Sequence, residues 1–213
     1  MDSWDPEARI KVAIRRQPSP TRRQATVRQA ALLVLGSLLP LACFIAVGGI
    51  RTGPRAWSLV VATVVGEASI SATALLMAVG RGGQMIGRSA LQLIATTIVA
   101  PLAFVSWKLL CSRWFQVGPW SAAGHRCLAL TVLFASFPFA AIVVARRGLA
   151  PFHPGSLGAA LGVASGLCAG VLLDLWCPSG ESTHLLLGHL LPIALLALLG
   201  ASVGQHALAM HGN

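Results

Sequence analysis

Charged residues are scarce in this chain. Only 10% of its 213 residues are Asp, Glu, Lys or Arg, whereas a soluble domain usually carries about 25%. The sequence also lacks a nucleophile elbow, a phosphate-cradling glycine loop and a zinc-protease motif. Its five cysteines are too scattered for a zinc motif of closely paired cysteines. These absences argue against a soluble domain and against an enzyme, and we expect neither catalysis nor a cofactor.

Long apolar runs take the place of the missing charge. Hydrophobic residues make up 55% of the chain, and a bilayer-spanning helix needs about 20 apolar residues in succession. The runs lack the short alternation of a β-barrel, so their backbone groups must pair within helices. The predicted fold class is all-α: a polytopic membrane helical bundle with six transmembrane helices. The predicted spans are residues 30–50, 57–80, 89–110, 127–145, 156–176 and 184–204.

The basic residues indicate the orientation of the bundle. A net charge of +10 would suit nucleic acid, but Lys and Arg lie in a tail and in short joints rather than on a face with stacking aromatics. We therefore predict no direct contact with nucleic acid. With the N-terminus in the cytoplasm, eleven of the 16 Lys and Arg residues lie inside and five outside, which the positive-inside rule favours. The predicted organisation is a basic cytoplasmic segment (1–29), a membrane domain in contact with lipid (30–208) and a cytoplasmic tail (209–213).

The N-terminal segment contains one short amphipathic stretch. Ile10, Ala13 and Ile14 are spaced to share one face of a helix, with Arg15 and Arg16 next to them. One interpretation is a disordered basic anchor that only sets the topology. The other is a segment that folds into the groove of a partner protein, with the apolar residues as its contacts.

Two acidic residues, Glu67 and Asp174, fall inside predicted spans. Ionisable groups are costly there and suggest a function by default. Glu67 lies near the middle of its span, and the other spans contain few polar residues that could contact it. This favours a protonated or hydrogen-bonded packing group over an ion pathway. Asp174 lies within a turn of Cys177, so we expect that it can reach the membrane interface.

Cysteines and histidines gather at the predicted outer face. Cys127 begins the fourth span and Cys177 ends the fifth. A disulfide can persist in an oxidising compartment, while thiols together with His125, His184 and His189 also suit soft metals. His184 and His189 should not share a face, because residues five apart are about 140° apart around an α-helix. Three roles remain open for the cysteine pair: a disulfide or redox sensor, a metal site, or no role of either kind. The three histidines are only weak metal candidates.

Glycines form two stripes with a spacing of four residues. The first stripe comprises Gly158, Gly162, Gly166 and Gly170, and the second comprises Gly200 and Gly204. Such stripes let helix backbones approach closely in lipid. They predict either a packing seam inside one bundle or a seam between the two copies of a homodimer.

Several short motifs together resemble a known family. They are Arg15-Arg16-Gln17-Pro18-Ser19-Pro20, Arg126-Cys127-Leu128, Arg146-Arg147-Gly148-Leu149-Ala150-Pro151, Trp176-Cys177-Pro178, and His184-Leu185-Leu186-Leu187-Gly188-His189 leading to Gly200 and Gly204. In these features the chain resembles the NrsF-like six-span membrane anti-sigma factors, including the CarR-type myxobacterial anti-sigma factors. The match is best over the last ninety residues.

This resemblance implies a function. It implies a multi-pass protein of the bacterial inner membrane that sequesters an ECF-type RNA polymerase sigma factor and releases it on stress, so that it regulates transcription negatively. The partner-binding candidates are then Ile10, Ala13, Ile14, Arg15 and Arg16. The family's paired cysteines at the outer ends of two spans look like Cys127 and Cys177, which makes these two the sensing candidates.

The chain departs from the family in its tail, which is short for the family. The joints at 81–88 and 146–154 therefore have to help cover the sigma factor. The alternative function is that of a small membrane transporter or metal-exporting bundle. It is supported by Glu67, Asp174 and the outer Cys and His residues. A structural membrane subunit of a larger complex is the third.

Overall fold

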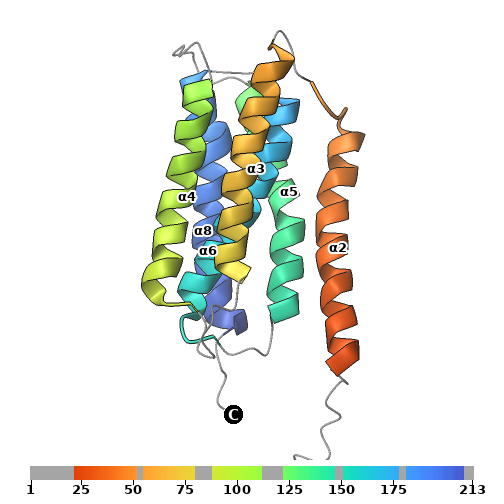
Figure 1. The fold of residues 1–213 in the computed structure, drawn as a ribbon, viewed down its shortest axis with the longest axis vertical. Helices are drawn as coiled ribbons and strands as arrows, with labels where there is room; N and C mark the ends of the chain where they lie inside the picture. The colour runs from red at the N-terminus through yellow and green to blue at the C-terminus, as the bar shows by residue number, and fades with distance from the viewer. Residues whose placement is uncertain are drawn as a thin grey trace, which may run out of the picture.

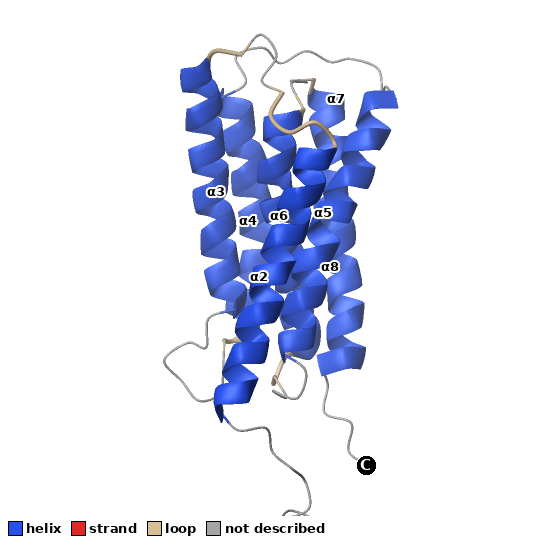
Figure 2. Cartoon of the chain, turned by 90° about the vertical axis from the view of Figure 1, so that its right-hand side faces the viewer, coloured by secondary structure: helices blue, strands red, loops and turns tan. Residues whose placement is uncertain are grey.

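The computed structural model describes residues 22–51, 55–79, 88–111, 122–146, 151–177 and 181–208. Five long helices come first: α2 (Arg22–Ala46), α3 (Trp57–Val79), α4 (Ala90–Cys111), α5 (Ala122–Arg146) and α6 (Pro154–Trp176). The last span consists of α7 (Ser182–Leu185), the π-helix η1 (Leu186–Leu190), α8 (Leu191–Val203) and the π-helix η2 (Gly204–Leu208). The helices stand side by side in an up-and-down bundle (Figure 1; Figure 2). The described residues form helices and no strand, which confirms the predicted all-α class with six helices.

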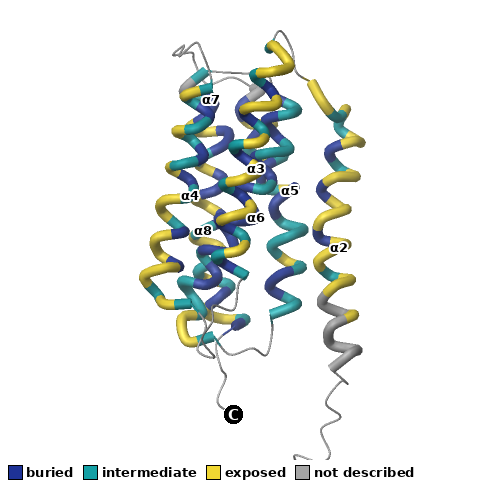
Figure 3. The backbone as a smooth tube through the Cα atoms, viewed as in Figure 1, coloured by how far each residue is buried: buried dark blue, intermediate teal, exposed yellow. Residues whose placement is uncertain are grey.

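Most of the helices have the length and composition of membrane spans. Those long and apolar enough to cross a bilayer are Trp57–Val79, Ala90–Cys111, Gly124–Arg146, Pro154–Trp176 and Thr183–Leu208. α2 contributes a shorter apolar stretch, Ala30–Ala46. Large apolar side chains such as Leu76, Leu91 and Leu198 lie exposed on the outer surface of the bundle, and exposed residues line α2 and α4 (Figure 3). An apolar outer surface of this kind suits contact with lipid, where it needs no polar cover.

Several helix boundaries differ from the predicted spans. α2 begins earlier, at Arg22, and ends at Ala46 rather than near Ile50, because Gly48 and Gly49 have positive φ values of 110° and 61°. Glycine adopts this left-handed backbone readily and often ends helices by doing so. α5 begins at Ala122, more than one turn before Cys127, and η2 extends the last helix to Leu208.

α6 is the central helix of the bundle. It packs against α3, α4, α5 and α8, and buried residues follow one another along most of its length (Figure 3). Gly158 and Gly162 lie directly against the backbone of α8: a Cβ at either position would collide with the carbonyl of Gly200 or Leu196. The two glycine stripes therefore form a packing seam inside the bundle, which is the first of the two interpretations offered by the sequence.

Gly162→Ala tests this seam. The added methyl group would meet the Leu196 carbonyl, and such overpacking costs about 1–3 kcal/mol because a helix backbone cannot move aside locally. We expect a lower free energy of unfolding, measured by denaturant titration in detergent micelles. Gly155→Ala is the matched control on the same helix, because its Cβ would meet only the flexible Gln205 side chain. Equal stability of the two variants would contradict the close approach.

Candidate functional site

A π-turn shapes the beginning of the last span. In η1 the backbone N–H of Leu191 donates to the carbonyl of Leu186, five residues earlier. This wider turn brings residues five apart to neighbouring positions. The rings of His184 and His189 lie with their centroids 5.5 Å apart, and both side chains are buried. The expectation that these two histidines do not share a face is therefore wrong, because it assumed regular α-helical geometry.

The two histidines lie beside Cys127 and Cys177 in what we call the thiol–imidazole cluster, made of Cys127, Cys177, His184 and His189. One potential ligand atom from each residue lies within 4.8 Å of those of the other three, and all four residues are buried. Cys177 Sγ is 3.1 Å from His184 Nε2. Both cysteines are free thiols. The cluster thus joins α5, the end of α6 and the first turns of the last span, and its atoms are close enough to hold one metal ion.

Thr131 and Gly188 hold η1 against α5 at this point. Thr131 Oγ1 donates to the Cys127 carbonyl at 2.8 Å and also lies 3.4 Å from the Gly188 carbonyl. A Cβ at Gly188 would stand 3.4 Å from Cys127 Cβ and 3.6 Å from His184 Nε2. Gly188 therefore packs at ordinary contact distance between the thiol and the imidazole.

A second polar group, the charge cluster, consists of Arg55, Glu67, Lys108 and Asp174. Lys108 Nζ on α4 lies 2.7 Å from Asp174 Oδ1 on α6 and 3.8 Å from Glu67 Oε1 on α3. Arg55 contacts the Asp174 carboxylate at 3.2 Å and donates to its backbone carbonyl at 2.6 Å. Both carboxylates are fully buried. Two acids thus face two bases, and buried charges are tolerated when paired in this way.

This cluster corrects one expectation from the sequence. Glu67 has a polar neighbour on another helix, because the Lys108 side chain on α4 extends towards it. Asp174 is buried inside the bundle with Lys108 and Arg55. A usable signal was present: Arg55, Lys108 and Asp174 all lie at helix ends that the predicted topology places on one face.

The charge cluster and the thiol–imidazole cluster adjoin each other. Asp174 and Cys177 are three residues apart at the end of α6, and Lys108 is close enough to interact electrostatically with Cys177. Leu173 packs with Cys127 and Cys177. Both clusters belong to the end of the bundle at which α7 lies (Figure 2), so thiols, imidazoles and balanced charges form one polar core there.

The other predicted site residues lie elsewhere. His125 is exposed on α5 and is not one of the four residues of the thiol–imidazole cluster. The partner-binding candidates Ile10, Ala13, Ile14, Arg15 and Arg16 lie outside the described residues.

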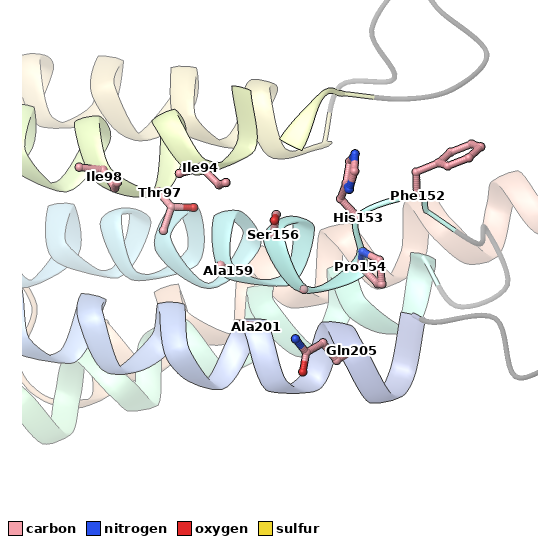
Figure 4. Close-up of a pocket in the computed structure, with 11 residues that line it drawn as sticks. Ile94, Thr97, Ile98, Phe152, His153, Pro154, Ser156, Ala159, Ala201 and Gln205 are labelled. Atoms are coloured by element: carbon pink, nitrogen blue, oxygen red, sulfur yellow. The ribbon is translucent and has the colours of Figure 1, made fainter. Parts of the chain in front are cut away.

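A cavity of about 560 Å³ opens at the opposite end of α6, between that helix, α4 and the last span (Figure 4). Its polar lining comes from Thr97, His153, Ser156 and Gln205, and its other lining residues are apolar or glycine. None of the lining residues is Asp, Glu, Lys or Arg. This lining does not select a class of ligand, and the polar core remains the stronger site.

Comparison with known proteins covers most of the chain. A family described as Negative regulator of sigma F (NrsF) matches residues 14–209. The anti-sigma-F factor NrsF of Caulobacter vibrioides is 30% identical over 204 residues, which cover 89% of this chain and 89% of that protein. No solved structure matches the chain. Because both similarities extend over nearly the full length and include the polar core, the chain belongs to the family of negative regulators of sigma F.

Proposed function

We propose that this protein is a multi-pass anti-sigma factor of the bacterial inner membrane that sequesters an ECF-type sigma factor and releases it on stress. The observation that carries the proposal is the family match over residues 14–209. A relative covering 89% of the chain is itself named an anti-sigma-F factor, and five helices suit a membrane. A sigma factor binds in the cytoplasm, so the chain must offer it a cytoplasmic surface.

That surface lies at the end of the bundle where α2 begins and η2 ends. In Figure 1 the start of α2 and the end of the last helix lie at the same end of the bundle, as an even number of spans requires. The excess of Lys and Arg in the N-terminal segment and inner joints supports a cytoplasmic position for this end. The polar core then lies at the outer end, where a stress from outside the cell would reach it first.

The N-terminal segment carries the contact in this proposal. Ile10, Ala13 and Ile14 supply its apolar face, and Arg15 and Arg16 steer it towards an acidic partner surface. An amphipathic helix lying in a groove derives its affinity from a few apolar anchors of this kind. The membrane domain would keep the segment, and therefore the sigma factor, at the membrane.

Replacing Ile10, Ala13 and Ile14 together by Asp tests the contact. Charges on the apolar face should weaken sigma-factor binding by about tenfold or more, because an anchor of an interface typically contributes at least 2 kcal/mol. Co-purification of the sigma factor from membranes should fall, and a sigma-dependent reporter should turn on without stress.

Val12→Asp is the matched control, because in the proposed helix Val12, two residues after Ile10, would face the other side. It adds a carboxylate to the same segment without changing the apolar face, so the reporter should stay off. Undiminished co-purification with the triple variant would place the contact elsewhere on the chain.

A further inference from the structure

We propose that the thiol–imidazole cluster is a closed tetrahedral site for a thiophilic divalent cation of the zinc type. Its ligands are Cys127 Sγ, Cys177 Sγ and one ring nitrogen each from His184 and His189. The sequence alone assigned no metal to these residues, since their spacing matches no compact zinc motif. The proposal does not depend on the sigma factor, because all four ligands lie within the helical bundle.

The geometry fits such an ion. Zinc binds thiolate sulfur at about 2.3 Å and imidazole nitrogen at about 2.0–2.1 Å, so neighbouring ligands of a tetrahedron stand roughly 3.3–3.8 Å apart. The four atoms here already lie within 4.8 Å of one another, and one pair, Cys177 Sγ and His184 Nε2, is 3.1 Å apart. Small side-chain rotations therefore complete the site without moving a helix. Two thiolates with two imidazoles form a common ligand set of structural zinc sites.

The burial of His189 supplies a second, independent argument. Its side chain is 2% exposed, yet neither ring nitrogen makes a hydrogen bond to a residue within the described part of the chain. A buried polar group without a partner destabilises a fold and calls for an explanation. A cation at the centre of the cluster would bind one of these nitrogens directly.

Charge balance supports a divalent ion. Two thiolates neutralise two positive charges, and two neutral imidazoles add none, so the loaded site has no net charge. A neutral site is what a buried, largely apolar location favours. The neighbouring charge cluster is balanced by itself, with Arg55 and Lys108 facing Glu67 and Asp174, and does not need to compensate the metal.

The elements that carry the ligands indicate what the ion does. Cys127 belongs to α5, Cys177 directly follows α6, His184 belongs to α7 and His189 to η1. One cation would therefore fasten three segments at one end of the bundle. Four protein ligands leave no open coordination position, which is typical of a structural site rather than of a catalytic one. The π-turn fits this role, since π-turns inside α-helices occur frequently at functional sites.

The test measures metal in the full-length protein. It is purified in detergent under nitrogen with a reductant and with an affinity tag that contains no histidine. Mass-spectrometric metal analysis should find about one zinc per chain, as a closed four-ligand site retains its ion. Cys177→Ser and His189→Gln should each lower this ratio at least fivefold. His125→Gln is the matched control, because His125 lies exposed on α5 outside the cluster, and it should keep the full ratio.

Cobalt exchange tests the wild-type protein without relying on any variant. Co²⁺ added to the metal-stripped protein should produce the intense visible bands of tetrahedral coordination together with thiolate-to-cobalt charge transfer. Cys177→Ser should lose the charge-transfer band of one sulfur. Wild-type protein with reduced thiols that contains no zinc and gives only the pale spectrum of hydrated Co²⁺ would overturn the proposal. Sigma-factor co-purification is unaffected by either result, so this failure is distinct from a failure of the proposed function.

Discussion

Lys108→Met is expected to destabilise the bundle by about 3–5 kcal/mol, because removing one partner of a buried ion pair leaves the other charge uncompensated. Lys108 Nζ lies 3.8 Å from Glu67 Oε1 and 2.7 Å from Asp174 Oδ1. In the variant Asp174 keeps Arg55, whereas the buried Glu67 loses the neighbouring lysine. The free energy of unfolding in detergent micelles, followed by circular dichroism, measures the loss.

Combining Lys108→Met with Glu67→Gln provides the control. The double variant removes one positive and one negative charge and leaves the pair of Arg55 and Asp174 intact. It should recover a large part of the lost stability, since replacing both partners of a buried pair is much less harmful than breaking it. A double variant less stable than Lys108→Met alone would mean that packing around Lys108, and not its charge, stabilises the bundle.

Cys127→Ser and Cys177→Ser are each expected to abolish the response of a sigma-dependent reporter to peroxide, with the protein still inserted in the membrane. The two sulfurs lie within 4.8 Å of each other, so once the cation proposed above has left the cluster, a short movement lets them bond. Peroxide would take two electrons from the thiols, which form one S–S bond and release two protons, and would itself be reduced to two waters. The new bond would shift the outer ends of α5 and α6, whose other ends lie towards the sigma factor in our proposal.

Cys168→Ser serves as the matched control, because Cys168 lies on α6 but outside the cluster. It should leave the response intact. Thiol labelling of membranes before and after peroxide treatment should show Cys127 and Cys177 disappearing together. A reporter that responds equally in the wild type and in both cluster variants would exclude this pair as the sensor.

Local chemistry was enough to predict the helices. Each span is a long apolar run bounded by polar joints, and lipid forces such a run to pair its own backbone. The class, the six helices and most of their bounds follow from this rule. The glycine stripes likewise predicted a close contact between two helices without identifying the partner helix, since glycine lets two helix backbones approach closely. The predicted end of the first span near Ile50 is wrong, because hydropathy alone does not show that the two glycines before it turn the backbone out of the helix.

The polar core required the tertiary structure. Lys108, Glu67 and Asp174 stand on three different helices, and no spacing within one helix reveals a pairing between helices. His184 and His189 meet because a π-turn replaces an α-turn where η1 packs on α5. Hydropathy acts along the chain and therefore determined the number of the helices. The choice of neighbours, and with it the meeting of two thiols, two imidazoles and four charges, depended on side-chain shape and was decided only when the helices packed.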